Sequence, residues 1–158
     1  MSDVFHLHQI AGDYIVYDLP EIRVKLTPLT MRGRGNLGSV FVNTVKSPVD
    51  NVLLLKGKLP EEAYQKALEN AVKQQQYWPP AIDSVEALNI MAGSYALQES
   101  LLAEMLRKFQ PEDCERLAKE LMETLTPTEY AKIGGFGWTG RRPDEPDFMN
   151  PSAASSGT

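Results

Sequence analysis

The chain has 158 residues, 42% of them hydrophobic and 23% charged, which predicts one soluble globular domain with a core of its own. Its formal net charge of -5 argues against a general nucleic-acid-binding protein, because contacts to phosphates need a surplus of positive charge. The single cysteine, Cys114, excludes an internal disulfide and a cysteine-rich zinc site.

The apolar runs of the sequence are short. The longest covers residues 52–55, far below the roughly 20 residues that span a bilayer. The first ten residues carry an early acidic side chain and no long apolar stretch, so they do not have the pattern of a secretory signal. The sequence therefore predicts a cytoplasmic protein without membrane attachment.

Two short strands are predicted near the N-terminus. Residues 14–17 are β-branched and aromatic, and residues 21–26 alternate between polar and apolar side chains. The turn-forming residues between the two runs favour a β-hairpin. His6 and His8 alternate ahead of this hairpin, but a metal site needs three or four converging ligands, so no metal site is predicted.

The segment that follows the hairpin contains the pattern G-x-G-x-x-G, formed by Gly33, Gly35 and Gly38. A dinucleotide site needs this pattern within a βαβ unit, between a buried strand and a helix. The preceding run is half polar, the one candidate strand that follows is 51–55, and no strand-like run comes after residue 60. Nucleotide binding by Gly33–Gly38 is therefore only a remote alternative.

Two other structures suit these glycines. They could form an irregular loop, or residues 29–45 could form a helix that the glycines weaken by about 1 kcal/mol each relative to alanine. In such a helix glycine would allow a second helix or another subunit to pack closely. Bulky substitutions at Gly35 or Gly38 are then expected to impair folding or assembly, and Arg32 and Arg34 to contact acidic groups of a partner.

The chain is predicted to be helical from residue 60 onward. Apolar side chains recur at spacings of three and four over residues 60–78, 85–110 and 111–125, with Gly93 as a weak point in the long middle run. The pair Asp83 and Glu86 and the pair Thr126 and Glu129 match the capping box that opens a helix. A last short helix is expected to end near residue 133, where two glycines follow.

Residues 134–158 are rich in Gly, Pro and Ser and lack apolar periodicity, which is typical of a flexible tail. The predicted class is mainly α (α+β), with one globular domain over residues 1–133 ahead of this tail. The domain comprises a β-hairpin region over residues 1–27 and a small helical bundle over residues 28–133.

The sequence offers candidate contact residues but no catalytic group. Cys114 lies on an apolar helix stripe, where a thiol packs as a small hydrophobic group, and acidic residues in first helical turns are explained by the helix dipole. The sequence therefore predicts a protein that is not an enzyme and has no cofactor. The candidate partner-binding residues are Arg32, Arg34, Trp78 and Trp138, although closure of the end of a helix bundle is the favoured explanation of Trp78.

The segments "VKLTPLTMRGR", "YWPP" and "TPTEY" occur in this order ahead of a Gly-rich end. Over roughly residues 21–137 the chain thereby resembles the tail assembly chaperones of tailed bacteriophages. The resemblance implies a non-enzymatic protein of the host cytoplasm that binds the tape measure protein and helps tail-tube subunits assemble around it. A structural virion protein of the tail, head–tail connector or baseplate is the alternative, and a homo-oligomer stays open.

Overall fold

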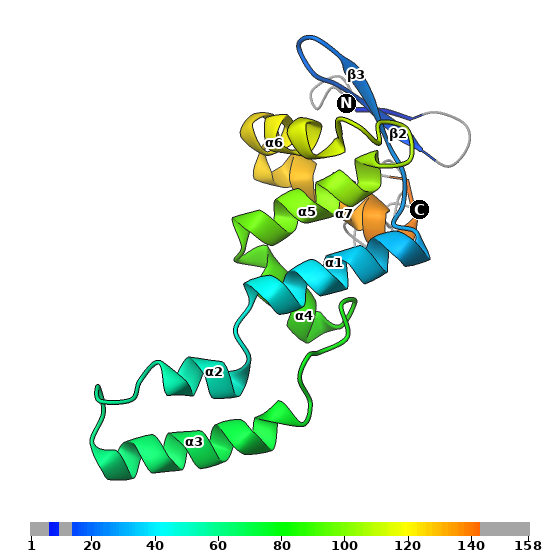
Figure 1. The fold of residues 1–158 in the computed structure, drawn as a ribbon. Helices are drawn as coiled ribbons and strands as arrows, with labels where there is room; N and C mark the ends of the chain where they lie inside the picture. The colour runs from blue at the N-terminus through cyan, green and yellow to red at the C-terminus, as the bar shows by residue number, and fades with distance from the viewer. Residues whose placement is uncertain (1–6, 10–13, 143–158) are drawn as a thin grey trace, which may run out of the picture.

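The computed structural model describes residues 7–9 and 14–142 of the chain (Figure 1). Within these residues it is mainly helical, with a small sheet at the N-terminal end, so the predicted fold class is confirmed. His6 and residues 143–158 of the predicted tail lie outside the described residues.

The sheet is antiparallel and its strands are in chain order. They are β1 (Leu7–Gln9), β2 (Ile15–Asp18) and β3 (Arg23–Leu26). The predicted hairpin is β2–β3, and β1 pairs with β2 as a third strand. Ile15 lies opposite Leu26 and Tyr17 opposite Val24, and all four side chains are buried. The alternation seen in the sequence therefore turns one face of the hairpin toward the helices.

The outer edge of β3 is covered by a side chain from far along the chain. The amide group of Gln110 accepts a hydrogen bond from the Lys25 N–H at 2.9 Å and donates one to the Lys25 carbonyl, also at 2.9 Å. An uncovered strand edge would leave these backbone groups without partners. Gln110 therefore takes the place of a further strand at this point.

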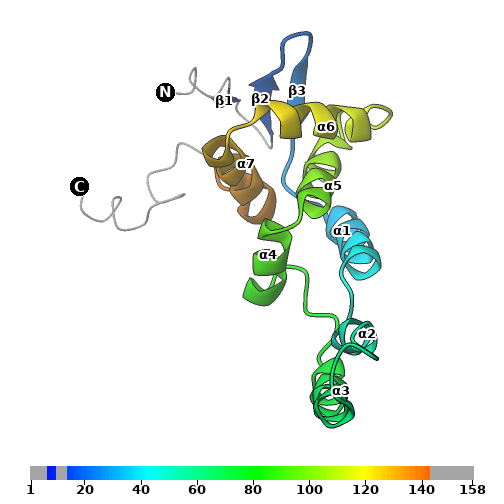
Figure 2. The same ribbon diagram turned by 90° about the vertical axis from the view of Figure 1, so that its left-hand side faces the viewer.

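Seven helices follow within the described residues. They are α1 (Met31–Thr44), α2 (Pro48–Leu53), α3 (Glu61–Gln75), α4 (Val85–Ala92), α5 (Tyr95–Leu106), α6 (Cys114–Thr124) and α7 (Pro127–Thr139). The central helix is α5, which packs against α1, α4, α6, α7 and β3 (Figures 1 and 2). Its side chains Leu97, Leu101, Leu102, Met105 and Leu106 are fully buried and form the middle of the core.

The helices α2 and α3 form an arm that extends away from this body (Figures 1 and 2). They pack mainly against each other, and the Val49 N–H donates to Gln75 Oε1 at 3.1 Å to join the two helices. The candidate strand at residues 51–55 is wrong, because residues 48–53 are helical. Ser47 caps this helix and Pro48 occupies its first position, and both favour helix over strand.

The single long helix expected over residues 85–110 is divided into α4 and α5 at Gly93 and Ser94. Ser94 Oγ accepts the Leu97 N–H at 3.2 Å and thereby caps a new helix. The cap of α4 is also one residue away from its predicted position. Ser84 Oγ accepts the Ala87 N–H at 3.1 Å, whereas Asp83 was expected in that role.

The capping box at the start of α7 is confirmed. Thr126 Oγ1 accepts the Glu129 N–H at 3.2 Å, and Glu129 Oε1 accepts the Thr126 N–H at 2.8 Å. The predicted end of this helix near residue 133 is wrong, since α7 continues to Thr139 and ends at Gly140, whose φ is 73°. The predicted tail therefore starts too early.

Close packing explains why glycines continue α7 instead of ending it. Gly134 and Gly137 are buried and face α5. A Cβ atom at Gly137 would lie 2.7 Å from Met105 Sδ, which is closer than packed atoms approach. At Gly134 a Cβ atom would lie 3.6 Å from Leu101 Cδ2, which is an ordinary contact, so the close approach of α7 to α5 depends on the missing side chain at Gly137.

Candidate functional site

The glycine pattern lies inside α1, with Thr30 as the N-cap of that helix. The strand before it, β3, belongs to an antiparallel sheet, and along the described part of the chain no strand follows α1. A dinucleotide site needs the parallel βαβ arrangement. The described residues therefore lack the setting in which this pattern binds a pyrophosphate.

One of the three glycines faces a second helix. A Cβ atom at Gly33 would lie 3.3 Å from Thr30 Oγ1 and 3.6 Å from Glu104 Cβ of α5, and the second distance is an ordinary van der Waals contact. The helices α1 and α5 pack together, but the spacing between them does not require glycine at this position. At Gly35 and Gly38 a Cβ atom would meet nothing within 4 Å. No contact of a Cβ atom within the described chain therefore accounts for an effect on folding, and the expected effect of bulky substitutions on folding or assembly stays a prediction.

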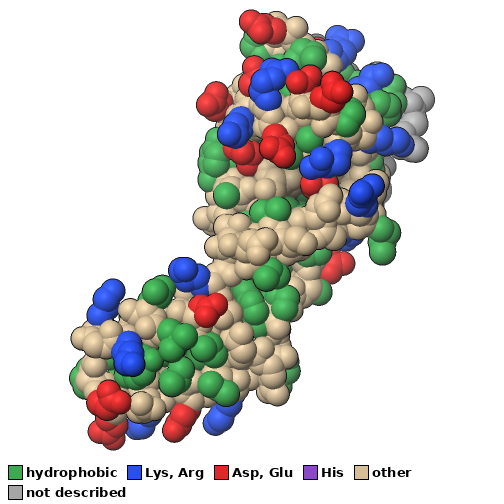
Figure 3. Space-filling model, in the orientation of Figure 1, with side chains coloured by type: hydrophobic (Ala, Val, Ile, Leu, Met, Phe, Trp, Pro, Cys, Tyr) green, Lys and Arg blue, Asp and Glu red, His purple; other side chains and the backbone are tan. Residues whose placement is uncertain are grey.

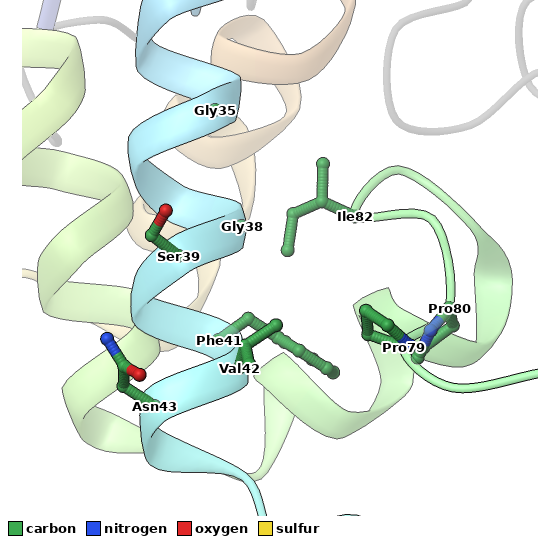
Figure 4. Close-up of a pocket in the computed structure, with 9 residues that line it drawn as sticks. All are labelled: Gly35, Gly38, Ser39, Phe41, Val42, Asn43, Pro79, Pro80 and Ile82. Carbon is green, nitrogen blue, oxygen red and sulfur yellow. The ribbon is translucent and has the colours of Figure 1, made fainter. Parts of the chain in front are cut away.

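Gly35 and Gly38 border an open groove of about 520 Å³ between α1 and the segment that leads to α4 (Figure 4). Phe41 and Val42 of α1 form one wall, and Pro80 and Ile82 face them from the other side (Figure 4). The groove is mostly apolar. It carries no charged side chain that would hold a phosphate or a metal ion.

The structure brings two of the four candidate contact residues together. The Arg34 guanidinium lies 5.2 Å from the centre of the Trp138 ring and donates a hydrogen bond from Nη2 to the Trp138 carbonyl at 2.9 Å. Arg34 Nη1 also lies 3.5 Å from Asp83 Oδ2. Arg34 therefore joins α1 to the end of α7 and to the segment before α4.

The other two candidates lie apart from this pair. Trp78 is half-buried, and its ring centre is 5.7 Å from that of Phe41, which agrees with a tryptophan that closes the end of the helical body. Arg32 is exposed on the first turn of α1. Among the four, Arg32 presents the most open side chain, and the others take part in packing within the chain.

One exposed apolar surface was not among the sequence candidates. Hydrophobic side chains gather over α2 and α3 (Figure 3). We call the exposed leucines of this region the arm patch; they are Leu53, Leu54, Leu55 and Leu59. Leu54 is 55% exposed, although leucine is usually buried. The signal was present as the longest apolar run of the sequence, which was interpreted as a candidate strand.

A second apolar strip lies on α3. Leu68 and Val72 line a shallow groove of about 360 Å³ together with Gln65, Glu69 and Lys73. Val72 is 58% exposed, whereas Tyr64 and Ala71 on another face of α3 are buried. This strip therefore belongs to the outer surface of the arm.

Burial shifts the pKa of two tyrosines among the described residues. Burial raises the pKa of Tyr130 well above its usual value of 10.0. Burial, and then the charge of Glu129, raise the pKa of Tyr17. Cys114 is buried on α6, as predicted. In the described ranges no group of three or more His, Cys, Asp or Glu side chains is placed to hold a metal ion.

Among the described helices, none has the length and apolar character needed to cross a membrane. Comparisons with family models, curated proteins and solved structures give no match to this chain.

Proposed function

We propose that this chain is a non-enzymatic assembly factor that acts by binding a helical segment of another protein. The resemblance of its sequence to tail assembly chaperones of tailed bacteriophages leads us to propose that role, with the tape measure protein as the client. The observation that carries the proposal is the arm patch. Its four leucines are exposed on an arm whose helices pack mainly on each other.

The energetics of exposed leucine support binding at this place. Fully burying an exposed leucine side chain contributes about 1.5–3 kcal/mol. The four leucines of the arm patch are between 36% and 55% exposed, so covering them would contribute part of that amount at each position. A large apolar patch on a water-exposed element is characteristic of protein-interaction sites. An amphipathic client helix suits such a surface, since its apolar face presents side chains at spacings of three and four.

Co-expression with the tape measure protein of the same phage tests this function. We expect the two proteins to co-purify, and the double substitution Leu53→Ser with Leu54→Ser to reduce the recovered complex at least about tenfold. Val85→Ser is the matched control, because Val85 is 75% exposed but lies on α4 in the body. Equal recovery of the complex with the arm variant and with the control would contradict the proposal.

Mass spectrometry of purified phage particles separates a chaperone from a structural virion protein. An assembly chaperone acts before the particle is complete, so we expect the mature particles to lack this chain. Its presence at the copy number of a tail subunit would show that the chain is a virion component instead.

A further inference from the structure

Four charged side chains form one stripe along α3. Glu62, Lys66, Glu69 and Lys73 follow each other at spacings of four, three and four, which places them on one side of a helix. All four are exposed. None of them has an ion pair within 4.0 Å to another described residue. We call this set the charge stripe.

The charge stripe lies beside the apolar strip of the same helix. Glu69 and Lys73 line the shallow groove together with Leu68 and Val72. An apolar seam with charges along its flank is the arrangement by which two helices pair and select their orientation. The arm therefore has a surface suited to a second helix, and the order of charges indicates which helix this is.

The signs of the charge stripe are self-complementary about the middle of α3. The midpoint lies between Ala67 and Leu68. Glu62 and Lys73 lie at equal distances on either side of it, and so do Lys66 and Glu69. A two-fold axis through this point, perpendicular to the helix, places a second α3 antiparallel to the first. It brings each glutamate opposite a lysine of the second copy. A parallel copy would instead bring Glu62 beside Glu62 and Lys73 beside Lys73.

Two further features favour the antiparallel pair. A two-fold axis perpendicular to α3 places each flank of the helix beside the same flank of the second copy. One charge stripe on a single flank is therefore enough to form both sets of ion pairs. The antiparallel arrangement also opposes the dipoles of the two helices. It brings the acidic first turn, with Glu61 and Glu62, beside the last turn of the other helix, where Lys73 lies.

From this pattern we infer that the chain forms a two-fold symmetric homodimer in which the α3 helices of two arms pack antiparallel near Leu68. Leu68 and Val72 of each copy are covered by the other copy, and the charge stripes form the flanking ion pairs. The inference goes beyond the proposed function and needs no client, because the dimer is a property of the purified chain alone.

Charge exchange along the stripe tests the dimer, with sedimentation equilibrium of the full chain as the measurement. Glu62→Lys and Lys73→Glu each replace two attractive pairs in the dimer by two repulsive ones, so we expect each to weaken dimerisation by about tenfold. The double variant restores opposite charges and should dimerise about as tightly as the unmodified chain. An equimolar mixture of the two single variants should do so too, as a heterodimer.

Matched controls carry the same charge changes outside the stripe. Glu123→Lys and Lys119→Glu alter exposed residues of α6 and should leave dimerisation unchanged. Circular dichroism reports whether each variant keeps its helices. The inference is overturned if the chain is monomeric up to the limit of its solubility, or if both single stripe variants dimerise normally. It is also overturned if their mixture fails to recover.

A cysteine cross-link tests the orientation separately. Leu68→Cys places a thiol near the proposed axis, whereas Gln76→Cys places one beyond the end of α3, far from its counterpart in an antiparallel pair. Cys114 is buried, so the unmodified chain provides the background for a short bismaleimide reagent. We expect a cross-linked dimer for Leu68→Cys only. Cross-linking through Gln76→Cys, or none through Leu68→Cys, would exclude the antiparallel arrangement.

Discussion

Two glycines inside helices are predicted to have opposite effects on stability when they are replaced by alanine. Gly35 faces open space in α1, so Gly35→Ala should raise the free energy of unfolding by about 0.5–1 kcal/mol, because alanine favours helix more than glycine does. Gly137→Ala should lower it by about 1–3 kcal/mol, because the new Cβ would overlap Met105. Urea unfolding followed by circular dichroism measures both. Equal stability of the two variants would contradict this packing.

The buried phenol of Tyr130 predicts a loss of stability at high pH. Its pKa is raised above 10.0 in the fold by burial, so the folded chain keeps the phenol neutral where the unfolded chain ionises it. The stabilising contribution is complete below pH 10 and is lost as the pH rises through the folded pKa. Tyr130→Phe should therefore reduce the fall in unfolding free energy above about pH 10. An unchanged pH dependence in urea titrations would contradict it.

Among the elements, β3 depends on a side chain that the sequence gives no reason to select. Gln110→Ala removes both hydrogen bonds to the Lys25 backbone, and we expect the free energy of unfolding to fall by about 1–3 kcal/mol. Gln76→Ala, at an exposed glutamine, is the control and should have little effect. Hydrogen exchange at the Lys25 amide should become faster in the Gln110 variant; exchange as slow as in the unmodified chain would show that the edge is protected in another way.

Elements defined by local chemistry were predictable, and those defined by packing were not. The capping box of Thr126 and Glu129 and the alternation in β3 contain their own signals, and both are confirmed. The continuation of α7 past residue 133 brings Gly137 against Met105, which is distant in the sequence, and local chemistry at the two glycines predicts a helix end instead. The division between α4 and α5 depends on the Ser94 cap, which competes with a continuous apolar pattern.

For the molecule as a whole, the sequence does not indicate that α2 and α3 extend away from the body as an arm. The apolar periodicity of α3 predicts a helix but does not show whether the body covers its apolar side chains. Periodicity indicates which residues share a face and not what they contact. Of the predicted contact residues, Arg34 and Trp138 pair within the chain. The apolar run that supplies most of the arm patch is also compatible with a short strand, so the sequence alone does not indicate an exposed patch. Its exposure is a property of the arrangement in space.

An arm that packs mainly on itself should be energetically separate from the body. Leu102→Ala, in the middle of α5, should lower the free energy of unfolding by about 2–5 kcal/mol, because it leaves a cavity in the core. Leu54→Ala should change it by less than about 0.5 kcal/mol, since the side chain is exposed and leaves no cavity. Dilute protein should be used in the urea titrations, so that association of arms does not add to stability. A large loss in Leu54→Ala would show that this side chain is packed and not exposed.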